Sequence, residues 1–434
     1  MSRKVGHIWH LLFCLTFTVF WGMPLHADTR DVIIGRVATT EPLSVAPPAR
    51  GGAVGKEIYS TLLKDLNRSH SFTLVDYDGP NVARPAVASG LIVPRGATYL
   101  VVLDVNDKGA QVVTAAYLLE AGGGGARWAR QYVLKSGSLR EGTHRIADDI
   151  HQEITGRPGF AATKIAYVAD HEGHPAIFTV SPDGHGHRRL VSGKFACLFP
   201  KFAPSRNWLV YTAYKRRFPE LFLIDVMSGR NHVLSGRPGL NSFGAISPDG
   251  LTVAATLSFS GNPEIYLLSM TGKVKTRLTK DRACDLSPSW SPDSKRIVYV
   301  SDTSGKPQLY VRNSDGTGER KRLTFPFNSS SYCVEPDWSP DGEDIVFCGR
   351  VAGNFDIMLV NVKSGDVTAL TEGGLHETAP AWAPDSRHVV YATETKGRTG
   401  LTVIDTLDSS KTFSIPLPAS RRRVRYPSWQ RVAN

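Results

Sequence analysis

Cysteine is scarce in this 434-residue chain, which contains five, and no two of them form a Cys-x-x-Cys pair. They are too few and too scattered for a disulfide scaffold. A chain of this length buries enough apolar surface to fold without covalent links. One disulfide between two of the residues Cys197, Cys284, Cys333 and Cys348 remains an alternative, because an oxidising compartment would allow it.

Long apolar runs are missing beyond the first 27 residues, so no later segment predicts a membrane span. In the leader, Arg3 and Lys4 precede an apolar run from Leu11 to Phe20, and Leu25-His26-Ala27 ends in a small residue. This order predicts a cleaved secretory signal peptide over residues 1–27. An uncleaved anchor is the alternative, but the run is shorter than the about 20 apolar residues that a span needs.

Acidic residues are outnumbered, with 40 Asp and Glu against 51 Lys and Arg, which gives a net charge of +11. The leader contains two of the basic residues and no acidic one, so its removal leaves +9. This charge favours anionic partners without requiring one. The basic clusters are short and typical of solvated loops: Lys215-Arg216-Arg217, Arg320-Lys321-Arg322 and Arg421-Arg422-Arg423.

Two sequence motifs of catalysis are absent. No Gly-x-Ser-x-Gly elbow occurs, so the chain lacks the nucleophile of the usual serine hydrolases. The glycines from Gly122 to Gly125 lack the Gly-Lys-Ser/Thr ending of a phosphate-binding loop and lie between two expected strands. They predict the tip of a β-hairpin.

Histidines gather around His171-Glu172-Gly173-His174, where the two histidines lie three positions apart in a segment with no expected helix. His185 and His187 follow in the next turn, and alternate residues of one strand can share a metal ion. No third ligand is identifiable, and a metal site is therefore disfavoured. We expect no catalytic residue, no cofactor and no metal.

A repeat of 44 to 48 residues runs from residue 163 to the end of the chain. In each copy an apolar residue leads into a Pro-containing turn, and a period of about 40–50 residues is typical of β-propellers. Proline followed by aspartate suits a tight turn, and these aspartates are turn formers rather than catalysts. The copies are Phe202-Ala203-Pro204-Ser205, Ile246-Ser247-Pro248-Asp249, Trp290-Ser291-Pro292-Asp293, Trp338-Ser339-Pro340-Asp341 and Trp382-Ala383-Pro384-Asp385.

Each copy predicts four strands, and the second strands near residues 165, 209, 253, 297, 345 and 389 give six blades. The repeat begins with a second strand at Lys164–Val168 and ends with a lone first strand at Tyr426–Trp429. We expect these two strands to complete one blade and to leave no open sheet edge. Trp290, Trp338 and Trp382 occupy one blade position and are expected to be structural.

Residues 28–158 lack the repeat and predict an N-terminal α/β domain, followed by an all-β six-bladed β-propeller over residues 159–434. The junction is expected near Arg157-Pro158-Gly159. Apolar stripes predict two helices, one around Ile58, Leu62 and Leu66 and one around Ile146, Ile150 and Ile154. The expected strands are Val32–Ile34, Phe72–Val75, Tyr99–Leu103, Val112–Leu119 and Trp128–Leu134.

This domain order, with Trp-Ser-Pro-Asp carried by the inner strands, resembles the TolB family of the bacterial Tol–Pal envelope system. The most specific stretch runs from Gly156 to Val168 and is similar to the interdomain junction of that family. Two features depart from the family: Phe202-Ala203-Pro204-Ser205-Arg206 lacks Asp-Gly, and the mature N-terminus alternates less regularly. The resemblance implies a non-enzymatic periplasmic protein that maintains the outer membrane and assists its invagination during cell division.

The resemblance also implies two partners, the peptidoglycan-associated lipoprotein Pal and the inner-membrane protein TolA. Other outer-membrane proteins are further candidates, no nucleic acid is expected, and membrane association would be peripheral. Pal would bind one mouth of the propeller and TolA the extreme N-terminus. By position, the TolA-binding strand comprises Asp28, Thr29, Arg30, Asp31, Val32, Ile33 and Ile34.

The segments that precede the Trp-Ser-Pro turns are the most variable part of the repeat, from Lys194–Phe199 in one copy to Arg423–Tyr426 in another. Variation on one face of a repeat protein is typical of a binding face. The predicted Pal contacts are Asn241, Phe243, Asp285, Leu286, Glu335, His376, Glu377, Thr378, Arg423 and Arg425. Glu335 and Glu377 have an alternative role, pairing with neighbouring blades, because buried acids need partners.

Two other functions stay open at this point. One is a ligand-binding or peptidase-like propeller with an unrecognised site. The other is a purely structural envelope protein without a specific partner.

Overall fold

A computed structural model describes residues 39–79, 93–123, 125–325, 332–351, 353–372 and 376–431. The predicted signal peptide and the predicted TolA-binding strand, residues 28–34, lie outside the described residues. Among the described residues, no helix combines the length and the apolar character that a membrane span requires.

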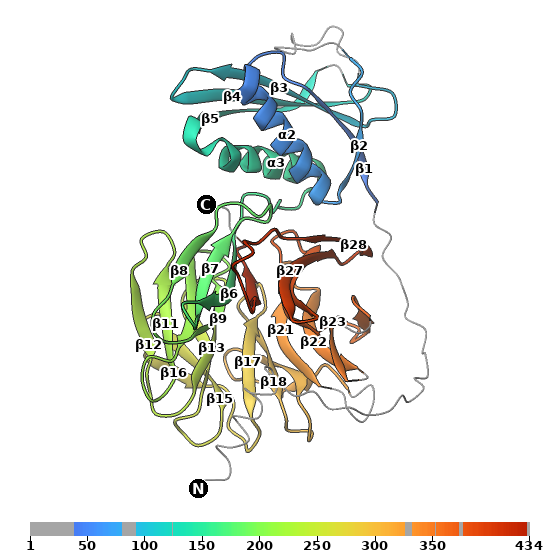
Figure 1. Ribbon diagram of the computed structural model, residues 1–434. Coiled ribbons are helices and arrows are strands. Elements are labelled where there is room, and N and C mark those ends of the chain that lie inside the picture. Colours follow the sequence, from blue (N-terminus) through green and yellow to red (C-terminus); the bar gives the residue numbers. More distant parts are fainter. Residues whose placement is uncertain are drawn as a thin grey trace. The chain divides into compact units, whose positions relative to one another are not determined.

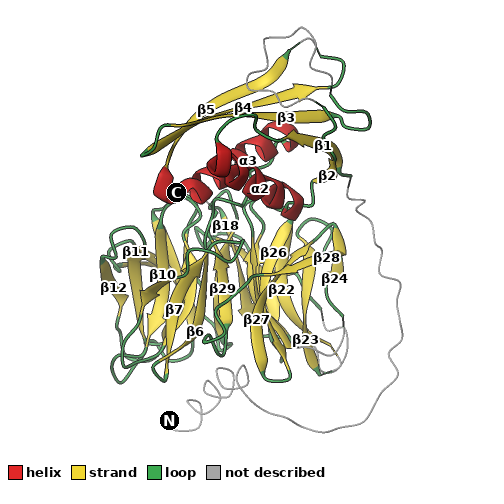
Figure 2. Ribbon diagram, turned by 45° about the horizontal axis from the view of Figure 1, so that its top comes forward, coloured by secondary structure: helices red, strands yellow, loops and turns green. Residues whose placement is uncertain are grey.

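The N-terminal region folds as an α/β domain with a five-stranded sheet in the order β2-β1-β3-β4-β5. Figure 2 shows that its two helices lie on one face of this sheet, where Ile58, Leu62, Ile146 and Ile150 are buried against it. The bounds are β1 Glu41–Ala46, α2 Gly52–Arg68, β2 Phe72–Val75, β3 Tyr99–Asp107, β4 Gln111–Glu120, β5 Ala126–Lys135, the 3₁₀ turn η1 Ser136–Ser138, and α3 Leu139–Thr155.

The sequence patterns predicted α2, β2–β5 and α3 but not β1, which pairs in parallel with both β2 and β3. The segment Glu41-Pro42-Leu43-Ser44-Val45-Ala46 carries a proline and a short apolar stretch, so it gives little strand signal. The expected strand at Val32–Ile34 lies outside the described residues. Helix α3 ends where Gly156 adopts a φ of 73°, a left-handed conformation that glycine reaches without strain.

From Ile165 onward, the described residues form six four-stranded antiparallel sheets, which are the six predicted blades (Figure 1). Their strands, from the innermost outward, are as follows. Blade 1 has β29 Arg425–Trp429, β6 Ile165–His171, β7 His174–Val180 and β8 Arg188–Val191, and blade 2 has β9 Cys197–Phe202, β10 Trp208–Ala213, β11 Glu220–Asp225 and β12 Asn231–Ser235. Blade 3 has β13 Asn241–Ile246, β14 Thr252–Leu257, β15 Glu264–Ser269 and β16 Val274–Arg277, and blade 4 has β17 Asp285–Trp290, β18 Arg296–Ser301, β19 Gln308–Asn313 and β20 Lys321–Arg322. Blade 5 has β21 Cys333–Trp338, β22 Asp344–Val351, β23 Asn354–Asn361 and β24 Val367–Ala369, and blade 6 has β25 His376–Trp382, β26 His388–Thr395, β27 Arg398–Asp405 and β28 Asp408–Ser414.

Blade 1 closes the ring, because its innermost strand β29 comes from the end of the chain and pairs with β6. Side chains reinforce this pairing. The indole Nε1 of Trp429 donates to Oγ1 of Thr163 at 2.8 Å, and the amide of Lys164 donates to Oε1 of Gln430 at 2.9 Å. The predicted shared blade is therefore confirmed, and both edges of the repeat region are paired.

The tryptophans at the ends of inner strands are buried between blades, with Trp338 and Trp382 at 0% and 1% exposure. Two of them also connect adjacent blades. Nε1 of Trp290 donates to the carbonyl of Ala245 in blade 3 at 2.9 Å, and Nε1 of Trp382 donates to the carbonyl of Asp337 in blade 5 at 3.0 Å. These rings thus stabilise the blade interfaces by burial and by a hydrogen bond.

We predict that Trp382→Ala lowers the free energy of unfolding by about 3–5 kcal/mol, because it leaves a cavity between blades 5 and 6. Trp382→Phe keeps much of the apolar area but leaves the carbonyl of Asp337 without its indole donor, which costs about 1–3 kcal/mol. Urea unfolding measures both effects. Trp208→Ala, at a half-buried position of blade 2, is the control with a smaller loss, and an unchanged unfolding midpoint in Trp382→Ala contradicts the structural role.

Candidate functional site

The propeller has two ends that differ in sequence and in environment. We call the end where the six innermost strands begin the start face, and the end with the Pro-containing turns after these strands the turn face. The turn face contacts the α/β domain: Nη1 of Arg387, in the turn of blade 6, donates to Oγ of Ser71 at 3.2 Å. Nε2 of His144 in α3 lies 3.1 Å from Oδ2 of Asp183, in a turn of blade 1.

Each innermost strand contains a bulge at the same place, where its pairing with the second strand shifts register. One residue of every bulge has a positive φ between 50° and 54°, and a proline or glycine follows it. A positive φ costs a non-glycine residue of the order of 1 kcal/mol or more, and bulges redirect side chains. We call the six residues the bulge ring: Phe199, Phe243, Ser287, Glu335, Ala379 and Tyr426.

The bulge ring is aromatic on one side and polar on the other. The rings of Phe199 and Phe243 lie 4.3 Å apart between centroids, and those of Phe199 and Tyr426 lie 4.5 Å apart, so blades 1 to 3 share one aromatic cluster. In blade 5, Oε2 of Glu335 accepts a hydrogen bond from the amide of Ala379 at 2.8 Å. Burial raises the pKa of Glu335, although this hydrogen bond opposes the shift. The pairing of Glu335 with a neighbouring blade was the alternative reading of this residue.

Two residues further along each strand, a buried polar network crosses the channel and centres on Asp337. Its Oδ1 accepts from Nζ of Lys201 in blade 2 at 2.7 Å and from Nη2 of Arg431 at 3.1 Å. Its Oδ2 accepts from the amide of Trp382 in blade 6 at 2.9 Å. Burial alone would raise the pKa of Asp337, but Lys201 and Arg431 outweigh it and lower the pKa. The network therefore ties distant blades together with a charged carboxylate.

The structure divides the ten predicted Pal contacts by exposure. Asn241, Asp285 and Glu377 are buried, and burial raises the pKa of Asp285 to about 7. Phe243 and Glu335 belong to the bulge ring, while Leu286, Thr378 and Arg425 are half-buried beside it; only His376 and Arg423 are well exposed.

A partner would therefore meet His376, Arg423 and parts of the bulge ring, and the three buried residues would act only through the loops that they hold. Asn241 does this through its Oδ1, which accepts from Oγ of Ser235 at 2.5 Å and from the amide of Arg237 at 3.2 Å. Phe199 and Tyr426 were not among the predicted contacts. The prolines that follow them, Pro200 and Pro427, were the available signal.

Comparison with known proteins agrees with this architecture. The model of a family described as the TolB beta propeller domain matches residues 151–433.

The chain belongs to the TolB family.

Among its relatives, the Tol-Pal system protein TolB of Bordetella parapertussis is 28% identical over 434 residues, which covers 96% of this chain and 94% of that protein. The Tol-Pal system protein TolB of Gluconobacter oxydans is 27% identical over 346 residues, with 68% and 76% coverage. The crystal structure of TolB from Acinetobacter baumannii superposes with a TM-score of 0.77 at 26% identity and covers 92% of this chain and 98% of that one. The TolB fold therefore extends over the α/β domain as well as the propeller.

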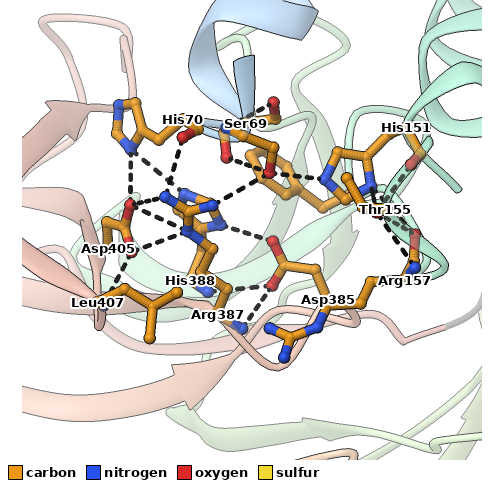
Figure 3. Close-up of polar contacts among 12 residues, drawn as sticks. Ser69, His70, His151, Thr155, Arg157, Asp385, Arg387, His388, Asp405 and Leu407 are labelled. Carbon is orange, nitrogen blue, oxygen red and sulfur yellow. Dashed lines mark hydrogen bonds and ion pairs between the residues drawn. The ribbon is translucent and has the colours of Figure 1, made fainter. Parts of the chain in front are cut away.

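A second polar cluster lies where the turn face of this TolB-family chain contacts the α/β domain (Figure 3). The guanidinium of Arg387 binds the buried carboxylate of Asp405 through Nε at 3.0 Å and Nη2 at 2.7 Å. Nδ1 of His388 lies 2.6 Å from Oδ2 of Asp385. His70 completes the cluster from the turn between α2 and β2, and burial together with nearby His388 lowers its pKa to about 4. Sequence reasoning missed this cluster.

A third polar group joins the same two regions through His144. Its Nδ1 lies 2.6 Å from Oδ2 of Asp65 and its Nε2 lies 3.1 Å from Oδ2 of Asp183, which also accepts a hydrogen bond from Arg140. Burial by itself lowers the pKa of His144, but the two carboxylates outweigh it and raise the pKa to about 9. An imidazolium between two buried carboxylates thus links α2, α3 and blade 1. The boundary between two separately folding domains near Arg157 stays a prediction. If the α/β domain and the propeller fold separately, the contact of His144 with Asp183 forms only when the two come together.

We predict that His144→Gln destabilises the protein by about 1–3 kcal/mol at neutral pH, because it removes the cation between two buried carboxylates and leaves Asp65 and Asp183 with only the more exposed Arg68 and Arg140. The folded-state pKa of about 9 exceeds the ordinary value of 6.5. The stabilising charge is therefore fully present below pH 6.5 and is lost as the pH rises through about 9. Urea unfolding of both proteins across this range should show the difference shrinking with rising pH. A difference that is independent of pH would mean that His144 acts by packing alone.

Proposed function

We propose that this chain is a non-enzymatic, periplasmic protein-binding component of the Tol–Pal system, which maintains the outer membrane and assists its invagination during cell division. Membership of the TolB family supports this role. The network inside the propeller is compatible with it, because the cations Lys201 and Arg431 are paired with the carboxylate of Asp337.

Pal is proposed to bind the start face. The observation that carries this proposal is the bulge ring: six equivalent backbone positions carry five kinds of side chain, and four of them, Phe243, Ser287, Glu335 and Tyr426, are partly exposed, while Phe199 and Ala379 are buried behind them. A backbone feature that repeats in every blade while its side chain varies is typical of a binding face on a repeat scaffold. The turn face already contacts the α/β domain through Arg387 and His144, which leaves the start face as the better candidate.

Arg423 and His376 are the best positions for a test, because both are exposed on the start face while Asp285 and Glu377 are buried. Arg423 has 68% of its side chain exposed and lies 3.7 Å from Asp170 of the same blade. Its φ of 51° favours aspartate among charged replacements, because aspartate tolerates the left-handed region.

We predict that Arg423→Asp combined with His376→Asp weakens Pal binding at least about tenfold, or about 1.4 kcal/mol, because it reverses one charge and adds a negative charge at the rim of the interface. Calorimetric titration with the soluble domain of Pal measures the effect. The matched control is Lys295→Asp, an exposed charge reversal in the turn of blade 4 on the turn face. Normal Pal binding by the double variant together with loss of binding in the control would place Pal on the turn face.

TolA is proposed to bind the mature N-terminus, Asp28 to Ile34. This stretch follows the predicted cleavage site and contains Val32-Ile33-Ile34, so it is able to add to an exposed sheet edge by main-chain hydrogen bonds. Such pairing needs few specific side chains.

We predict that deleting residues 28–34 from the mature protein abolishes binding to TolA and leaves Pal binding intact or stronger. Pull-downs with purified TolA and Pal measure both interactions on the same preparation. Because Pal binding serves as the control for folding, retained TolA binding by the truncated protein would refute the proposed site.

A further inference from the structure

Three potential metal ligands converge where the α/β domain contacts blade 6. Nδ1 of His70, a nitrogen of His388 and a carboxylate oxygen of Asp405 all lie within 4.8 Å of one another. Nδ1 of His70 is 3.3 Å from Nε2 of His388 and 3.7 Å from Oδ2 of Asp405. Ligand atoms about 2.0–2.1 Å from a tetrahedral zinc ion stand about 3.3 Å apart. The two separations that involve His70 are therefore close to an edge of a zinc tetrahedron, and the third pair, His388 and Asp405, lies within 4.8 Å, so a small side-chain adjustment would close the site around an ion.

The ring of His388 is already oriented as in a metal ligand. Its Nδ1 lies 2.6 Å from Oδ2 of Asp385, so Nδ1 carries the proton and Nε2 presents its lone pair toward His70. Asp385 is itself fixed, since its Oδ1 accepts from the amides of Arg387 and His388 at 2.9 and 3.0 Å. A carboxylate behind a histidine sets the tautomer and strengthens the other nitrogen as a ligand.

The carboxylate of Asp405 is fixed in the same manner. Arg387 binds it on one side, and the amide of Leu407 donates to its Oδ1 at 2.9 Å. Nε of Arg387 lies 3.0 Å from both carboxylate oxygens, so a cation at Oδ2 can take the place of that shared contact while Nε keeps Oδ1 and Nη2 keeps Oδ2. Asp385 and Asp405 outweigh the single charge of Arg387, and nearby Lys411 has its own partner, Asp408, at 3.6 Å. The charge of the cluster is therefore suited to a divalent cation.

His70 brings the third ligand from the α/β domain and keeps the site accessible. Its backbone has a φ of 50°, which is uncommon for a residue other than glycine, and its carbonyl accepts from Nη2 of Arg387 at 2.9 Å. Its side chain is 17% exposed, whereas that of Asp405 is fully buried. An ion would enter from the side of His70, where water can supply a fourth ligand. Figure 3 shows the His70 ring directed at both His388 and Asp405.

We propose that His70, His388 and Asp405 bind one Zn²⁺ ion, with water as the fourth ligand, and that the ion ties the α/β domain to blade 6. Two imidazole nitrogens and one carboxylate oxygen are a ligand set that zinc favours. Because His70 belongs to one region and the other two ligands to the other, the ion strengthens the contact between them.

The test is calorimetric titration of the metal-free mature protein with zinc sulfate. The expected result is one equivalent of tight binding, and substitution of Co²⁺ should give the visible absorption of a tetrahedral site. His70→Asn removes a ligand at a position where asparagine tolerates the positive φ, and it should weaken zinc binding about a hundredfold or more. His232→Asn, at an exposed histidine of blade 2, is the matched control and should bind zinc as the unaltered protein does.

Thermal unfolding gives a second readout. It uses the His70 variant rather than a His388 variant, because His388 is buried and its replacement would disturb folding. Zinc should raise the midpoint of the unaltered protein and of His232→Asn, because a ligand that binds only the folded state stabilises it. It should leave the midpoint of His70→Asn unchanged. Zinc binding of equal strength in His70→Asn, or no binding by the unaltered protein at micromolar zinc, would overturn the proposal.

Discussion

The pairing of β29 with β6 is the interaction on which the rest of the propeller depends. It joins the last strand of the chain to the first strand of the repeat, and Trp429, Gln430 and Thr163 reinforce it through side-chain hydrogen bonds. Without it, blade 1 would lack its innermost strand and two sheet edges would be open to other chains. With it, six innermost strands surround one channel at fixed positions. Both faces of the propeller are consequences of that closure.

Inside the closed ring, scaffold and variable positions are separated along each innermost strand. The buried end, with Trp338 or Trp382, packs between blades, and the buried carboxylate of Asp337 connects blades across the channel. The bulge a few residues earlier carries five kinds of side chain in the six blades at nearly the same φ. The conformational free energy of the positive φ is thus similar in all blades, whereas the side chain at the bulge varies. This separation is what a rigid scaffold with an adaptable binding face requires.

The repeat and its consequences could be predicted from the sequence, because each blade repeats local turn chemistry, such as Ser291-Pro292-Asp293, every 44 to 48 residues. The closing of the ring could also be predicted, because the repeat begins with a second strand at Lys164 and ends with a lone first strand at Trp429. Strand β1 escaped prediction because Pro42 and a short apolar stretch give a weak pattern. Local patterns also failed to show which start-face residues are exposed, since Asp285 and His376 look equally polar in sequence but lie at opposite extremes of burial. The His70–His388 contact spans 318 residues of chain, and no local pattern carries such information.

Hydrogen exchange of the mature protein, with and without the soluble domain of Pal, tests the central claim most directly, that the start face is the docking surface for a partner. Mass spectrometry resolves the two faces, because each innermost strand begins at one and ends at the other. We expect slower exchange around residues 376–379 and 422–426 in the complex, and no change around residues 291–295 on the turn face. Protection confined to the turns, with unchanged exchange at the bulge ring, would contradict the account.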